Sequence, residues 1–125
     1  MEDNYIYISP LSTVLNELEE ISNISYIDLY ILSLSHTKNL TQIKKEWLKK
    51  YVSFISEENW IILTKENGDY TNENREEIKA MKMQEYTDYD HLILLDDDHG
   101  ILKQTSNVLH NKVNVFHISS VFIWY

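Results

Sequence analysis

Two patterns of apolar residues alternate along this chain, one typical of strands and one typical of helices. Short runs rich in β-branched and aromatic residues, typical of strands, occupy residues 4–8, 27–34, 60–64, 91–95 and 113–118. Apolar residues at helical spacing fill residues 10–21, 41–55, 72–86 and 101–109 between them. The clearest helix is 41–55, where Ile43, Trp47 and Leu48 begin an apolar stripe that lysines flank. Each segment thus has a predicted type before any chemistry is considered.

This order of segments predicts the class of fold. Strands that alternate with helices imply crossover units, and hence a mostly parallel sheet with helices on both faces. We therefore expect an α/β, three-layer, Rossmann-like sandwich around a five-stranded sheet. Neither a linker nor a repeat divides the 125 residues, so we expect a single domain over 1–125.

Composition narrows the classes of function. The formal net charge of −9 argues against direct binding to a nucleic-acid backbone. The absence of cysteine excludes disulfides and thiol nucleophiles, and two glycines are too few for a P-loop or a dinucleotide turn. No apolar run is long enough for a membrane span, and the first residues do not resemble a secretory leader, so we expect a cytoplasmic protein with no membrane contact.

The segment with the most chemical information is the apolar run 91–95 that ends in Asp96, Asp97 and Asp98. Ligands of open α/β sheets bind at the carboxyl ends of strands, and a hard cation such as Mg²⁺ relieves repulsion between adjacent carboxylates. The alternative is an ordinary acidic turn. His99 follows these acids and could contact a ligand, although a hydrogen-bonding role is the commoner one.

Several short motifs, taken in order, resemble the haloacid-dehalogenase-like phosphohydrolases, in particular their nucleotidase-like members. Residues 27–35 resemble the second motif, a strand ending in a hydroxyl residue, and residues 45–48 resemble the helix that follows it. Residues 94–97 resemble the fourth motif, in which a strand delivers paired aspartates to Mg²⁺, and residues 113–119 resemble the last core strand.

The resemblance implies a core of this family without a cap domain, and it implies roles for individual residues. Ser33, Ser35 and Lys65 would bind phosphate, while Asp96 and Asp97 would bind Mg²⁺. The third-motif lysine is open among three candidates. Lys65 is preferred because it directly follows a strand, although the family register falls nearer to Asn74 or Arg75. Lys79 and Lys82 are interpreted as surface residues.

The first motif departs from the family pattern. Ser9 stands at the position of the nucleophilic aspartate and Leu11 at that of the general acid/base, while Thr13 remains. Leucine cannot transfer a proton, and Ser9 has no histidine or lysine nearby in sequence to activate it, so we expect Ser9 to cap the helix that follows. The other explanation is that the segment with the true first motif is absent from this chain.

Three hypotheses of function follow. The first is a catalytically degenerate domain that binds or regulates a protein partner or a small phosphate ligand and retains weak Mg²⁺ or phosphate binding. The second is a weak Mg²⁺-dependent phosphatase of the 5′-nucleotidase kind, or a piece of one. The third is an acidic, phage-type inhibitor that occupies the groove of a host defence nuclease, suggested by the acid-rich stretch 57–98. The sequence does not fix the oligomeric state.

Overall fold

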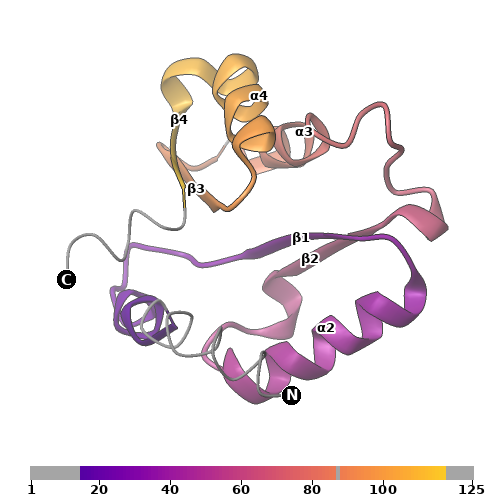
Figure 1. Ribbon diagram of the computed structural model, residues 1–125. Helices are drawn as coiled ribbons and strands as arrows, with labels where there is room; N and C mark the ends of the chain where they lie inside the picture. The colour runs from indigo at the N-terminus through magenta and orange to yellow at the C-terminus, as the bar shows by residue number, and fades with distance from the viewer. Residues whose placement is uncertain (1–14, 87, 118–125) are drawn as a thin grey trace. The chain divides into compact units, whose positions relative to one another are not determined.

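The computed structural model describes residues 15–86 and 88–117 (Figure 1). The chain divides into two compact units, Met1–Asp69 and Tyr70–Tyr125, and each is described by itself.

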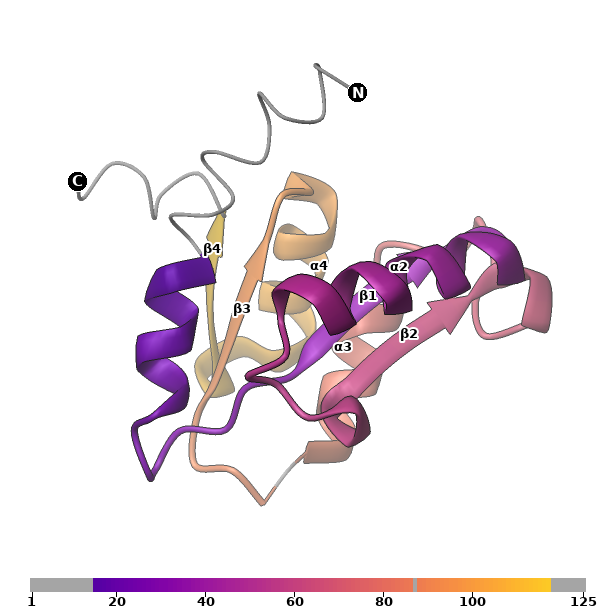
Figure 2. The ribbon, with the colours of Figure 1, turned by 90° about the horizontal axis from the view of Figure 1, so that it is seen from below.

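The first unit contains a strand–helix–strand crossover. Residues 15–22 are helical and precede it. Its strands pair in parallel, with Ile31 opposite Trp60 at one end and Ser35 opposite Thr64 at the other. The helix runs along one side of this pair (Figures 1 and 2). The elements are β1 (Ile31–Ser35), α2 (Lys38–Tyr51), η1 (Glu57–Asn59), β2 (Trp60–Thr64) and η2 (Lys65–Asn67).

Side chains at both ends of α2 stabilise its limits, by hydrogen bonds at the N-terminus and by charge at the C-terminus. The Thr37 hydroxyl accepts the Leu40 N–H at 3.1 Å, and the Glu66 carboxylate accepts the Lys38 N–H at 2.7 Å. These acceptors satisfy amides that a helix N-terminus leaves without intrahelical partners. Lys49 and Lys50 lie in the last turn, where positive charge complements the helix dipole. The helix limits are therefore set by side chains that the sequence places at its two ends.

The core of the first unit lies where the end of α2 meets the segment that follows it. Leu48, Val52 and Ile55 are buried there. Trp60 packs against this cluster, and its indole N–H donates to the Ile55 carbonyl at 3.0 Å. The indole thus buries apolar area while its polar atom stays bonded.

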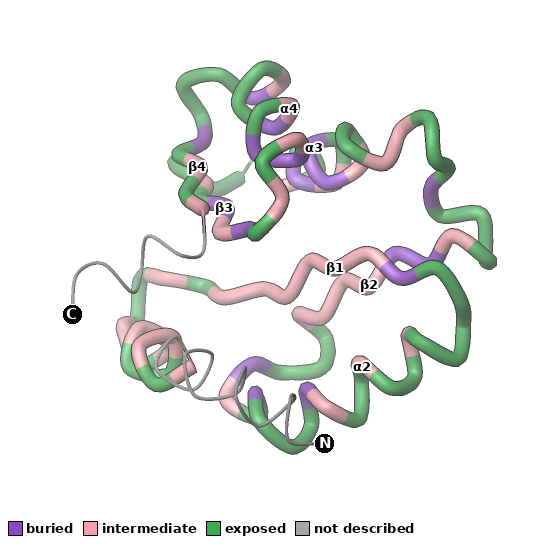
Figure 3. Tube along the Cα trace, in the orientation of Figure 1, coloured by how far each residue is buried: buried purple, intermediate pink, exposed green. Residues whose placement is uncertain are grey.

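The second unit contains another crossover of the same kind. Its two strands are parallel, with Leu92 opposite Val113 and Asp96 opposite His117. The connecting helix packs on β4 and on α3, and buried positions lie along both helices (Figure 3, purple). The elements are α3 (Ile78–Met83), η3 (Gln84–Tyr86), β3 (Leu92–Asp96), α4 (His99–Leu109), η4 (His110–Lys112) and β4 (Val113–His117).

The predicted positions of most elements agree with the structure. The strand predicted over 60–64 is β2, and the strands predicted over 91–95 and 113–118 are β3 and β4 within one residue. The helix predicted over 72–86 is shorter, because only Ile78–Met83 is α-helical. Residues 27–30 lie outside β1, although they were predicted as strand. The strand predicted over 4–8 lies outside the described residues.

The predicted five-stranded, three-layer sandwich is wrong. Over residues 15–86 and 88–117, the strands form two separate two-stranded sheets, β1 with β2 and β3 with β4. The physical reason is that an apolar run shows that a strand is buried but does not show which strand it hydrogen-bonds. In each unit, the strand after the crossover helix pairs with the strand before it, and no further described strand joins either pair. Among the described helices, none has the length and apolar character needed to cross a bilayer.

Two glycines are expected to respond oppositely to alanine. Gly68 has φ +84, so Gly68→Ala should cost about 1 kcal/mol, since L-residues are strained there. Gly100 lies in the first turn of α4, where alanine is favoured by roughly 0.5–1 kcal/mol. A Cβ there would meet only the Glu76 carboxylate at 2.7 Å, and that exposed side chain can turn away. Urea unfolding of both variants checks this, and shifts of the same sign would contradict it.

Candidate functional site

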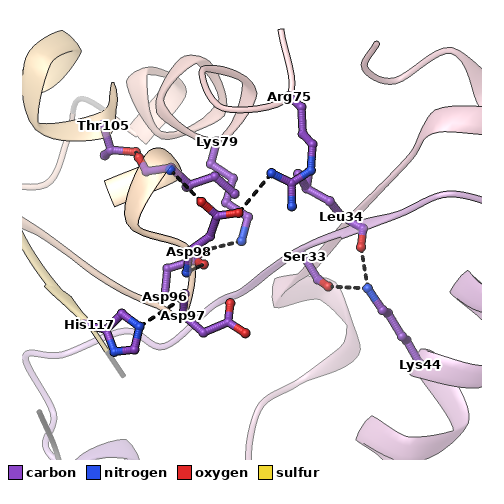
Figure 4. Close-up of polar contacts among 11 residues, drawn as sticks. Ser33, Leu34, Lys44, Arg75, Lys79, Asp96, Asp97, Asp98, Thr105 and His117 are labelled. Carbon is purple, nitrogen blue, oxygen red and sulfur yellow. Dashed lines mark hydrogen bonds and ion pairs between the residues drawn. The ribbon is translucent and has the colours of Figure 1, made fainter. Parts of the chain in front are cut away.

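The most deeply buried charges of the second unit lie at the carboxyl end of β3. Asp96 is the last residue of this strand, and side-chain alternation places it on the same face as buried Leu94. Lys79 lies on α3 and donates from its ammonium to Asp96 Oδ2 (Figure 4). The two side chains are only 9% and 5% exposed. An ion pair of opposite formal charges is therefore enclosed in the protein.

The Asp96 carboxylate is bonded at both oxygens. While Oδ2 accepts from Lys79, Oδ1 accepts the Asp98 N–H at 3.0 Å. A buried carboxylate is tolerated only when its charge is paired and its remaining lone pairs are bonded. Asp96 meets both conditions, and it also fixes the turn that leads from β3 into α4.

Asp98 is the N-cap of α4. Its Oδ1 accepts the Ile101 N–H at 3.1 Å, and its Oδ2 accepts from the Arg75 guanidinium at 2.9 Å (Figure 4). The hydrogen bond from Arg75, followed by that from the Ile101 amide, lowers the pKa of the Asp98 carboxyl below its usual value. Asp98 is therefore an ionised cap, bound to the helix and to a cation at once.

Asp97 differs from its neighbours because it is exposed. Its backbone carbonyl accepts from His117 Nε2 at 3.0 Å. The His117 ring stacks on that of His99, with centroids 4.4 Å apart and planes 18° apart. Both histidines thus lie beside the acidic turn. The sequence placed His117 in the last strand, which the structure confirms.

This arrangement bears on the predicted Mg²⁺ ligands Asp96 and Asp97. Mg²⁺ requires near-octahedral oxygen coordination. The Asp96 oxygens are already bonded to an ammonium and an amide, which leaves the exposed Asp97 as the accessible carboxylate of the pair. Within the described part of the chain, no three acidic or histidine side chains are grouped so that they could hold a metal ion. Mg²⁺ binding by Asp96 and Asp97 stays a prediction.

The predicted phosphate-binding residues lie in the first unit. The Ser33 hydroxyl accepts from Lys44 Nζ at 3.0 Å, and the same ammonium donates to the Leu34 carbonyl (Figure 4). Ser35 is buried at the end of β1, opposite Thr64, and Lys65 directly follows Thr64. Ser35 and Lys65 therefore lie at the same end of this sheet, whereas Asp96 and Asp97 belong to the other unit. Phosphate binding by these residues stays a prediction.

The interpretation of Lys79 as a surface residue is wrong. Lys79, Ala80 and Met83 form the buried side of α3, whereas Met81 is 48% exposed. Lys82 was interpreted correctly as peripheral, since it pairs with Glu85 at 3.3 Å near the surface. Lys79 was assigned to the surface because lysine usually faces solvent. The i, i+3 spacing of the apolar residues Ala80 and Met83 indicates the side of the helix that is buried.

Ser9 and Leu11, at the first-motif positions, lie outside the described residues. Comparison with protein-family models, with curated proteins and with solved structures finds no match for this chain. The resemblance to the phosphohydrolases therefore rests on the motifs alone.

We expect the Lys79–Asp96 pair to behave as a unit. Lys79→Met should lower the free energy of unfolding by about 3 kcal/mol, because it leaves a carboxylate buried without its cation. The double variant Lys79→Met/Asp96→Asn should lose less than the sum of the single losses, by at least about 1 kcal/mol. Urea unfolding of the full cycle measures this coupling.

The matched control is Lys82→Met on the same helix, whose exposed ion pair should be worth less than about 1 kcal/mol. Additive losses for the two members of the buried pair would show that they do not interact as described.

The lowered pKa of Asp98 predicts a pH-dependent stability. Its ionised form is favoured by folding, so this stabilisation is complete above the ordinary carboxyl pKa and is lost as pH falls through the lower folded value. Asp98→Asn keeps a good cap but removes the charge, and should cost less than about 1 kcal/mol at pH 7. The difference from the wild type should shrink in acid, as followed by urea unfolding between neutral and acidic pH.

Proposed function

We propose that this protein acts by binding a partner and that its acidic turn performs no phosphoryl transfer. The observation that carries this proposal is the enclosed Lys79–Asp96 pair. In the resembled family, the aspartate at this position coordinates Mg²⁺. Here a protein cation takes up its charge, and removing that cation would leave buried charges unpaired.

The two neighbouring acids support the same conclusion in different ways. Asp98 is engaged by Arg75 and by the first turn of α4, so its carboxylate maintains the helix start. Asp97 remains exposed, and a single carboxylate would hold Mg²⁺ mostly through water. The acidic turn is thus accounted for by its structural roles, with Asp97 left for contact with a ligand.

The sequence of the first motif adds an independent argument. Phosphoryl transfer in the resembled family needs a nucleophilic aspartate and a second one that moves the proton. This chain carries Ser9 and Leu11 at those positions, and leucine has no proton to give. The ligand we propose is a protein or a small phosphate compound, without Mg²⁺ as a required cofactor.

One observation favours the alternative of a weak phosphatase. A lysine beside an aspartate at the end of a strand also suits a site that neutralises phosphoryl charge. In that case Mg²⁺ would have to compete with Lys79 for Asp96. The third hypothesis, an acidic inhibitor of a nuclease, draws on Glu73, Glu76 and Glu77, which are all exposed.

A phosphatase assay separates binding from catalysis. We expect the purified chain to release no phosphate above the buffer rate from p-nitrophenyl phosphate or a 5′-mononucleotide at millimolar Mg²⁺. Calorimetry over the same range should show no saturable Mg²⁺ binding, because Lys79 holds Asp96.

Mg²⁺-dependent turnover that Asp97→Asn abolishes would contradict the proposal. The matched control is Asp90→Asn, an exposed aspartate of the same unit that lies before β3 and should leave any turnover unchanged. Asp97 suits this test better than Asp96, because we expect the loss of one member of the buried pair to destabilise the fold.

A further inference from the structure

Asparagine is followed by glycine at one place in the chain, Asn67–Gly68. Asn67 is the last residue of η2 and is exposed, and Gly68 follows it in the left-handed conformation with φ +84. A Cβ built at Gly68 would meet no atom within 4 Å. The Gly68 nitrogen and the Asn67 side chain are therefore neighbours in an open turn, without a side chain of residue 68 to separate them.

The fold places little restraint on the two groups of this pair. Among the described residues, none forms a hydrogen bond or an ion pair with the Asn67 side-chain amide. The Gly68 N–H donates to the Lys65 carbonyl at 2.9 Å. That hydrogen bond lies in an exposed turn, where local opening costs far less free energy than global unfolding. A local motion of the turn is thus enough to bring the Gly68 nitrogen to the Asn67 side-chain carbonyl.

The same turn connects the end of β2 with the start of α2. The Glu66 N–H donates to the His36 carbonyl at 3.1 Å, and the Glu66 carboxylate accepts the Lys38 N–H at 2.7 Å. The Asp69 carboxylate accepts the Thr64 N–H at 2.8 Å. Residue 67 lies between these two acids, so a longer backbone or a new negative charge there acts directly on the bonds that Glu66 and Asp69 make.

We infer that Asn67 is a site of spontaneous deamidation and that its conversion to isoaspartate loosens the start of α2. The Gly68 nitrogen attacks the side-chain carbonyl carbon of Asn67. A carbon–nitrogen bond forms, and the side-chain nitrogen leaves as ammonia with the proton that the Gly68 nitrogen gives up. Water then opens the succinimide ring at either carbonyl, which yields aspartate or isoaspartate. This site goes beyond the proposed function, because it involves neither the acidic turn nor a partner.

Incubation of the full chain at mildly alkaline pH, followed by peptide mapping with mass spectrometry, tests the modification. The matched control is Asn111, an exposed asparagine of the 3-10 turn η4 that is followed by Lys112. We expect Asn67 to lose ammonia several-fold faster than Asn111, at a rate that rises with pH because the Gly68 nitrogen attacks after losing its proton. Gly68→Ala should slow the reaction at Asn67 several-fold, since a Cβ hinders the approach. Equal rates at Asn67 and Asn111, or no effect of Gly68→Ala, would overturn the inference.

Hydrogen exchange tests the structural effect. The Lys38 N–H is bonded to Glu66, so it should exchange several-fold faster in the incubated protein than in the fresh protein. The Leu102 N–H, bonded to the Asp98 carbonyl at 3.1 Å in the second unit, should not change. Asn67→Gln keeps an amide but disfavours the ring, so incubation of this variant should leave Lys38 exchange unchanged. Deamidated protein in which Lys38 exchanges at the original rate would overturn the claimed effect on α2. None of these outcomes bears on phosphate release or Mg²⁺ binding, so failure here is distinct from failure of the proposed function.

Discussion

The enclosed ion pair between Lys79 and Asp96 is the constraint on which the second unit depends. A lysine ammonium and an aspartate carboxylate leave water only if each compensates the other. Their pairing fixes α3 to the end of β3, and the other Asp96 oxygen fixes the turn toward α4. Asp98 then starts that helix and holds Arg75. The buried pair thus connects α3, the end of β3 and the start of α4, and the same hydrogen bonds occupy both oxygens of the Asp96 carboxylate.

The two units use similar crossovers with different chemistry at the strand ends. In the second unit, acids after β3 are matched by cations from the preceding segment. In the first unit, a lysine of the crossover helix is held by a hydroxyl and a carbonyl of β1, beside an apolar pocket. Charges that are matched internally stabilise the local structure.

The motif resemblance is informative about local structure and weak about mechanism. It placed Asp96 and Asp97 correctly at the end of a strand, and it singled out Ser33, which does line a pocket. Its register for the third-motif cation fell near Asn74 or Arg75, and Lys65 was preferred only because it follows a strand, whereas Lys79 is the lysine that contacts Asp96. A short motif records which residue types follow a strand, but the partners of those residues come from elements distant in the chain.

The sequence by itself determined where most strands and helices lie, because apolar periodicity and capping residues act over a few neighbouring positions. The segment 60–64 and the acidic turn after β3 are examples, since each could be located without knowledge of any distant residue. Tertiary structure alone decided that β1 pairs with β2 and β3 with β4, and that Lys79 is inside. Strand pairing and the burial of a charge depend on contacts between residues far apart in the chain, and no local pattern specifies those partners.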